Sequence, residues 1–101
     1  MNVYIWLDDE RPMPAPPFGC GMIIHAHNYW EALYPILRSY CDGDEIYVDF
    51  DHDLGEKKTG YDVAKWLVEN EIKVKYHVHS MNPVGRANIE QLLDHYGYER
   101  F

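Results

Sequence analysis

Four short apolar segments alternate with polar and helix-like segments along the chain. Val3–Leu7 is a continuous apolar run that stops at two aspartates, which is typical of a strand buried in a parallel sheet. Comparable runs predict strands over 21–27 and from residue 44 into a run of carboxylates. Strict alternation of apolar and polar positions predicts a fourth strand over Lys73–Ser80.

Three other segments carry the start signals and apolar spacing of amphipathic helices. A capping residue followed by Asp or Glu three positions later predicts helices over Tyr29–Ser39 and from Thr59 to 69–70. A proline at the first helical position predicts a last helix over about 84–95. Pro35 should kink the first of these helices, because proline lacks the N–H that an inner turn needs.

The segment 10–20 separates the first two predicted strands and holds four of the six prolines, so it predicts a loop. The order is then strand, loop, strand, helix, strand, helix, strand, helix. Strands that alternate with helices predict an α/β fold, with an open parallel sheet of four strands and right-handed crossovers. The length of 101 residues predicts a single domain over 1–101.

The two faces of the predicted sheet differ in chemistry, because side chains alternate between the faces of a strand. One set is aliphatic: Val3, Ile5, Leu7, Ile24, Ala26, Ile46, Val48, Phe50, Val74, Tyr76 and Val78. The other set is aromatic, acidic and rich in histidine: Tyr4, Trp6, Asp8, His25, His27, Tyr47, Asp49, Asp51, Asp53, Lys75, His77 and His79. If the helices cover the aliphatic face, the second face is left to the proline-rich loop, the C-terminal tail or a partner. An ordinary wet face and a homodimer interface stay open as alternatives.

The composition excludes several classes of function. Apolar residues make up 47% and aromatic residues 15% of the chain, which predicts a folded domain. The net charge of -8 argues against binding to a nucleic-acid duplex and favours a metal ion or a small ligand. No apolar run approaches the roughly 18 residues of a membrane span, so we expect a cytoplasmic protein without membrane contact. Cys20 and Cys41 lack CxxC spacing and are expected to stay reduced.

Aspartates follow the first and third predicted strands, at the edge where the C-terminal ends of parallel strands meet. We expect Asp8, Asp9, Asp51 and Asp53 to converge there, and carboxylates in close reach repel one another unless a cation is bound. Oxygen ligands suit Mg²⁺ or Mn²⁺. The sequence therefore predicts a divalent metal site, and the alternative is a pair of solvated loop ends.

Two histidines and two helix starts extend this candidate site. His77 and His79 lie on one strand face, where they can ligate a metal, act as acid and base on a phosphate ester, or face water. Free N–H groups at the helix starts near Thr59 and Ser80 would bind a phosphate, and capping is the alternative. Arg11 is a cation within reach of such a phosphate.

These motifs resemble the receiver domain of two-component response regulators. In that family an acidic pair and a third aspartate bind Mg²⁺, and the third aspartate accepts a phosphoryl group. Here a proline-rich loop stands where a receiver has its first helix, and neither a fifth strand nor its Lys-Pro is expected. From Leu7 to about Leu93 the chain is similar to a divergent group, the cyclic-phosphate-processing receiver-like domains. The segments that carry this similarity are Leu7–Pro12, Phe50–Gly55, Thr59–Asp62 and His77–Gly85.

The resemblance implies a truncated receiver-like (flavodoxin-like) fold and metal-dependent hydrolysis of a cyclic phosphate or cyclic nucleotide. Three sets of site residues are predicted. The catalytic set is Asp51, Asp53, His77 and His79; the phosphate-binding set is Arg11, Thr59, Ser80 and Asn82; the metal set is Asp8, Asp9 and Asp51. The alternative is a receiver-like module that binds a phosphate ligand or a protein without catalysis.

Overall fold

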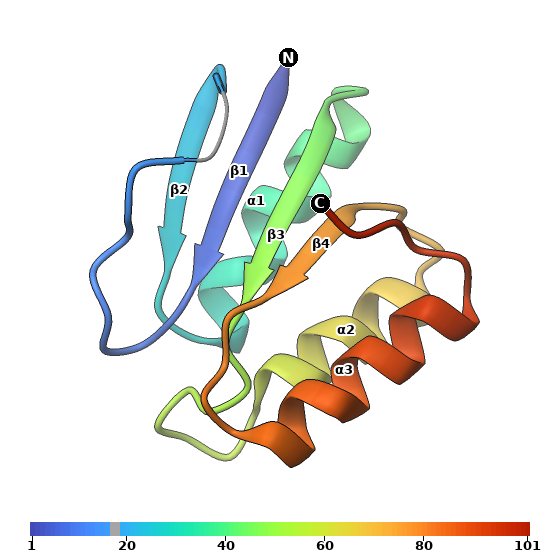
Figure 1. Ribbon diagram of the computed structural model, residues 1–101. Coiled ribbons are helices and arrows are strands. Elements are labelled where there is room, and N and C mark those ends of the chain that lie inside the picture. The colour runs from blue at the N-terminus through green and yellow to red at the C-terminus, as the bar shows by residue number, and fades with distance from the viewer. Residues whose placement is uncertain (17–18) are drawn as a thin grey trace.

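The computed structural model describes residues 1–16 and 19–101 and contains a four-stranded parallel sheet with three helices (Figure 1). The strands are β1 (Asn2–Leu7), β2 (Met22–Ala26), β3 (Glu45–Phe50) and β4 (Lys75–Val78), in the order β2-β1-β3-β4. The helices are α1 (Tyr29–Cys41), α2 (Gly60–Glu69) and α3 (Pro83–His95). This confirms the predicted truncated receiver-like α/β fold, and the described residues form no fifth strand.

Element boundaries depart from the sequence prediction by two residues in β4 and α1 and by one residue at some other ends, and β4 begins at Lys75 instead of Lys73. β4 ends at Val78 instead of Ser80, because its partner β3 has ended at Phe50, whose carbonyl accepts the last bond from the His79 N–H at 2.9 Å. α1 continues through Pro35 and ends two residues later than predicted, while the kink stays a prediction. The described part of the 10–20 segment forms no helix or strand, and its residues 17 and 18 lie outside the described residues.

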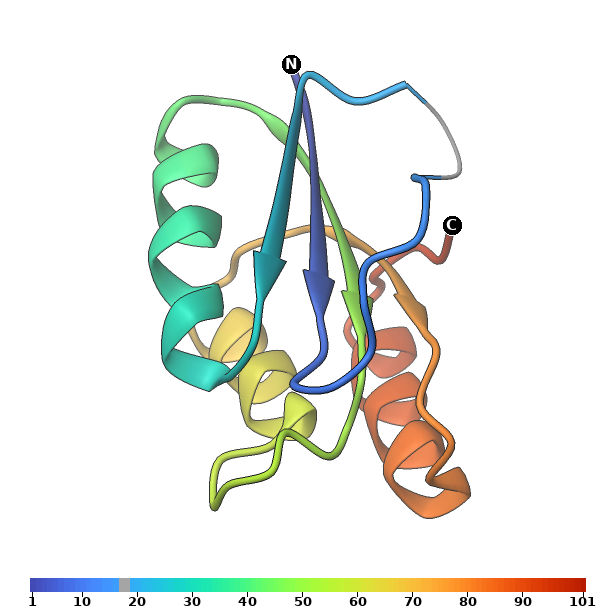
Figure 2. The same ribbon diagram turned by 90° about the vertical axis from the view of Figure 1, so that its left-hand side faces the viewer.

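All three helices pack on the aliphatic face of the sheet. The main core joins strand residues such as Val48 to Ile36 of α1, Leu67 of α2 and Leu93 of α3, all fully buried. Figure 2 shows α1 on one side of the sheet and the segment that follows β1 on the other. The periodicity of the strands therefore predicted correctly which face carries the helices.

Irregular segments of the same chain cover the middle of the second face. Tyr4, Trp6 and Tyr47 form a small cluster against which Met13, Cys20 and Phe101 pack. Phe101 reaches this face because the chain end runs along the outer edge of β4, where backbone bonds join Tyr76 to residues 99 and 101. The proline-rich loop and the tail thus cover the middle of this face, whereas His77 on β4 stays exposed.

The strand order creates a switch point between β1 and β3. From β1 the chain moves outward to β2, and α1 then connects β2 to β3 on the other side of β1. Connections leave the C-terminal ends of β1 and β3 in opposite directions, so a crevice forms between them, and such crevices bind ligands in open α/β sheets. Among the described residues, the longest helices have 13 residues and are too short and too polar to cross a bilayer.

Buried tyrosines, Tyr76 and Tyr98 among them, should make the stability of the fold depend on pH at the alkaline end. Burial, reinforced by a hydrogen bond to Asp94, raises the pKa of Tyr76 from 10.0 to about 12. Burial likewise raises the pKa of Tyr98 to about 12, and its hydroxyl donates to the Ile72 carbonyl at 2.8 Å. Because these hydroxyls ionise more readily in the unfolded chain, each contributes on the order of 2 kcal/mol that is complete below pH 10 and lost as the pH rises through about 12.

We therefore expect the urea midpoint of unfolding to fall between pH 10 and about 12. The Tyr98→Phe variant should lose less of its stability over the same range, because one of the buried ionising hydroxyls is gone. A midpoint that stays constant in the wild-type protein would contradict this expectation.

Candidate functional site

Three side chains from three different strands meet at the C-terminal edge of the sheet. Asp8 follows β1, Asp51 follows β3 and His79 follows β4, so each occupies the first position after its strand ends. One ligand atom from each lies within 4.8 Å of the other two, and we call these residues the Asp/His cluster. The cluster lies at the switch point between β1 and β3.

Asp8 is fully buried and holds the turn that follows β1. Its Oδ1 accepts the backbone N–H groups of Glu10 at 2.9 Å and Arg11 at 2.8 Å, which bends the chain back over the carboxylate. Burial alone would raise the pKa of Asp8, but these N–H groups and the His79 ring outweigh it and lower the pKa below its ordinary value. The carboxylate is therefore stabilised in its ionised form.

Arg11 places a positive charge beside the cluster. Its Nε lies 3.3 Å from Asp8 Oδ2 and its Nη2 lies 3.9 Å from Asp51 Oδ2. The side chain is 44% exposed, so the guanidinium lines the pocket while it contacts both carboxylates. It can therefore meet an anion that enters the site from solvent.

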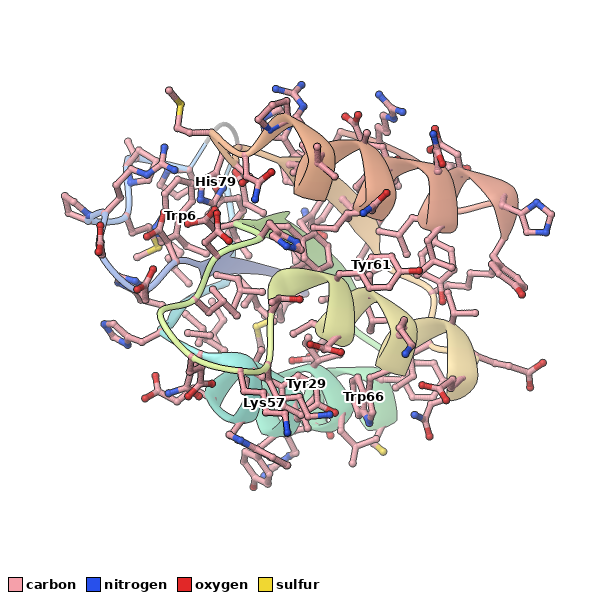
Figure 3. The ribbon with its side chains drawn as sticks, turned by 90° about the horizontal axis from the view of Figure 1, so that it is seen from below. Trp6, Tyr29, Lys57, Tyr61, Trp66 and His79 are labelled. Carbon is pink, nitrogen blue, oxygen red and sulfur yellow. The ribbon has the colours of Figure 1, made fainter. Side chains whose placement is uncertain are left out.

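The His79 ring is held on both edges and on one face. Its Nε2 lies 2.9 Å from Asp8 Oδ2 and its Nδ1 lies 2.7 Å from Asp49 Oδ1. Trp6 stacks against the ring with centroids 3.8 Å apart and planes 6° apart, and the two side chains lie together in Figure 3. His79 is therefore rigidly placed, in contrast to a solvated histidine at a strand end.

A pocket of about 600 Å³ opens over the cluster. Its lining is strongly acidic, with Arg11 as the cation and Met81 at the rim: Asp8, Asp9, Glu10, Arg11, Asp51, Asp53, Gly55 and Met81. So many carboxylates in one concave surface favour a bound cation over an empty, mutually repelling arrangement. The Asp/His cluster could therefore hold a metal ion, and the donor set of two carboxylates and one imidazole fits a divalent one.

Two of the predicted carboxylates line the pocket but lie outside the cluster. Asp9 is partly exposed, and its Oδ2 comes close to Gly55, where a Cβ would overlap it. Asp53 is exposed and accepts a hydrogen bond from Asn82 Nδ2 at 3.3 Å. Between Asp51 and Asp53, the structure brings Asp51 into the cluster.

Three of the predicted phosphate-binding residues are engaged at helix starts, where Thr59 and Asn82 cap helices and Ser80 holds the turn before α3. Thr59 caps α2, where its N–H and hydroxyl both donate to Asp62 Oδ2. The Asn82 Oδ1 caps α3 by accepting the N–H of Gly85 at 3.0 Å, and the buried Ser80 Oγ accepts the N–H of Asn82. None of the three lines the pocket, so among the predicted phosphate-binding residues Arg11 does so within the described part of the chain.

His77 lies apart from His79 although both side chains lie on the second face of the sheet. Its ring is exposed and packs near Phe101, with centroids 6.0 Å apart. It lines a different pocket, beside Tyr4 and Asp49. The structure therefore brings one of the two predicted histidines to the cluster.

The sequence analysis did not single out three residues that support the cluster: Tyr4, Trp6 and Asp49. All three lie on the second face of the sheet, and their strand parity pointed there. Asp49 was one acidic residue among several in its segment, so nothing in the sequence distinguished it from its neighbours. The contact of Asp49 with His79 Nδ1 depends on the position of the His79 ring in the folded chain.

Comparison with known proteins agrees with this architecture. A family model described as the cyclic-phosphate processing receiver domain matches residues 3–95 of the chain. No curated protein and no solved structure matches the chain. The family match includes β1 from its second residue, the other three strands, all three helices and every member of the Asp/His cluster. The chain therefore belongs to the cyclic-phosphate processing receiver domain family.

Proposed function

We propose that this protein is a metal-dependent phosphoesterase that opens a cyclic phosphate or cyclic nucleotide at the Asp/His cluster. The observation that carries the proposal is the convergence of three donor atoms, from Asp8, Asp51 and His79, within 4.8 Å at an acidic pocket with one arginine. The family to which the chain belongs supports the choice of a cyclic phosphate as substrate.

The donor set favours Mg²⁺ or Mn²⁺ as the bound ion. Two buried carboxylates are hard oxygen ligands, which both ions prefer, and the imidazole of His79 favours Mn²⁺ between them. When bound, a divalent ion supplies positive charge that attracts the phosphate and activates a water for attack. Asp8 and Asp51 remain ionised ligands, and Asp8 is prepared for that role by the hydrogen bonds that lower its pKa.

We assign the binding of the substrate phosphate to Arg11. Its guanidinium lies between the two carboxylates of the cluster and faces the pocket, where its planar fork can bind two phosphate oxygens. In the proposed reaction a water oxygen bonds to phosphorus and one ester bond of the ring breaks. The attacking water gives up one proton and the released alkoxide takes up one, so the product is a phosphomonoester with a free hydroxyl.

The proposal is tested with a panel of 2′,3′- and 3′,5′-cyclic phosphates incubated with the protein and Mg²⁺ or Mn²⁺. We expect new phosphomonoester signals in the ³¹P spectrum, and we expect chelation to prevent them. Tight binding with the ligand recovered unchanged would contradict the enzymatic function and indicate a phosphate-binding module. A protein that neither binds nor converts any member of the panel would contradict both.

His77 and His79 provide an internal comparison of the metal site. The His79→Ala variant removes a donor from the cluster and should weaken Mn²⁺ binding by at least about 100-fold, because loss of a group that merely supports a ligand already costs about 10–100-fold. The His77→Ala variant removes an exposed ring outside the cluster and should change the affinity less than about twofold. Calorimetric titration of both variants measures the difference, and a larger loss in His77→Ala would contradict the assignment.

A further inference from the structure

The contacts of Asp49 are unusual for a carboxylate in an acidic site. Asp49 lies on β3 with its side chain on the second face of the sheet, and it is 6% exposed. A buried carboxylate near Asp8 and Asp51 adds like-charge repulsion and a desolvation cost, which other contacts must offset. Asp49 lies outside the three-residue cluster, so metal ligation does not provide that offset.

Both oxygens of Asp49 have short hydrogen bonds. Its Oδ2 accepts the Tyr4 hydroxyl at 2.7 Å, and its Oδ1 lies 2.7 Å from His79 Nδ1. Burial and the bond to Asp49 raise the pKa of Tyr4, so its hydroxyl keeps the proton that it donates. An ionised carboxylate accepts and does not donate, so the hydrogen bond to Asp49 takes its proton from His79 Nδ1. The contact of Nε2 with the ionised Asp8 likewise takes a proton from the ring in the metal-free protein, and a bound metal ion would take the place of that proton.

Trp6 restricts the remaining freedom of the His79 ring. Its indole covers one face of the ring in a nearly parallel stack, and its Nε1 donates to the Arg11 carbonyl at 3.1 Å. The stack fixes the plane of the ring, and Asp49 fixes its rotation within that plane. As a result, Nε2 is the nitrogen that faces Asp8.

We propose that Asp49 is a positioning residue that holds the His79 ring by Nδ1, so that Nε2 is presented to the Asp/His cluster as a ligand. The proposal rests on the metal site of the proposed function and names the residues that prepare it. Ligating histidines commonly donate their second ring N–H to a carboxylate, which fixes the tautomer and raises the basicity of the ligand nitrogen. Tyr4 and Trp6 complete this support from β1.

Two substitutions of Asp49 test the proposal against a matched control. Asp49→Ala removes the acceptor, whereas Asp49→Asn keeps an acceptor oxygen and removes the charge. The control is Asp94→Ala, because Asp94 also accepts a tyrosine hydroxyl, that of Tyr76, but lies in the last turns of α3 away from the cluster. Folding of each variant is checked by its unfolding transition.

The first readout is Mn²⁺ affinity. We expect Asp49→Ala to bind Mn²⁺ about 100-fold and Asp49→Asn about tenfold more weakly than wild type, with Asp94→Ala unchanged. The smaller loss of Mn²⁺ affinity in Asp49→Asn would reflect the acceptor oxygen that asparagine keeps. A folded Asp49 variant that binds within twofold of wild type would overturn the proposal, and Asp49→Asn decides the matter if Asp49→Ala does not fold.

The second readout is the imidazole proton of His79 in the metal-free protein, followed by NMR with ¹⁵N-labelled histidine. We expect Nδ1 to carry a proton that exchanges slowly with water in wild type and Asp94→Ala, and rapidly in Asp49→Ala. Slow exchange that survives in a folded Asp49→Ala would overturn the positioning role. A wild-type protein that binds no Mn²⁺ would instead contradict the proposed function, and the proton exchange would still test the positioning.

Discussion

Replacing Asp51 with asparagine should abolish metal binding without loss of stability. Loss of a group that merely supports a metal ligand costs about 10–100-fold in affinity, so loss of a ligand itself should cost at least about 100-fold. The metal-free variant should be at least as stable as wild type, because within the described residues the Asp51 carboxylate has a long ion pair with the half-exposed Arg11, at 3.9 Å. Removing its charge also relieves repulsion from Asp8.

The matched control for this variant is Asp53→Asn. Asp53 lies on the same loop and lines the same pocket, but it is exposed and outside the Asp/His cluster. We expect its Mn²⁺ affinity to fall by less than about tenfold. Calorimetric titration and urea unfolding of both variants separate binding from stability. Equal losses of affinity in the two variants would contradict the assignment of Asp51.

The Gly60→Ala variant should be destabilised by about 2 kcal/mol, the usual cost of overpacking a site that has no free volume. α2 begins directly against the end of β3, where the Gly60 N–H donates to the His52 carbonyl at 2.8 Å. A Cβ at this position would overlap the backbone carbonyl of Asp51. Because backbone on both sides of the contact must move, the variant should also weaken Mn²⁺ binding by shifting Asp51.

The sign of this effect distinguishes the close approach from ordinary helix propensity. Where the backbone allows it, a change from glycine to alanine stabilises a protein by about 0.4–1 kcal/mol, because it restricts the unfolded chain. Gly19→Ala is the control, because a Cβ there meets nothing within 4 Å. Urea unfolding measures both variants. A Gly60→Ala variant as stable as Gly19→Ala would show that α2 does not press on the end of β3 as described.

The sequence predicted the layers of this fold because strand periodicity records burial directly. Alternation along β1 separated Val3 and Ile5 from Tyr4 and Trp6, and the structure buries the two pairs on opposite faces of the sheet. The end of β4 was predicted less well, because it depends on where its partner β3 stops. Such partner-dependent boundaries are not encoded in the pattern of a single strand.

The site was predicted at the level of strand ends, and its internal arrangement was not. Strand order placed Asp8, Asp51 and His79 at one edge of the sheet, as the sequence suggested. Whether Thr59 caps a helix or binds a phosphate depends on the partners of its hydroxyl, which the sequence leaves open. The support that Asp49 gives to His79 arises from side-chain reach across three strands, which only the folded chain reveals.

The most direct test of the metal site is a crystal structure of the protein grown with Mn²⁺, analysed by its anomalous scattering. We predict an anomalous peak bounded by the carboxylates of Asp8 and Asp51 and by Nε2 of His79, and no peak there in crystals of Asp51→Asn. Crystals at saturating Mn²⁺ that show no peak among these three side chains would contradict the proposed metal centre.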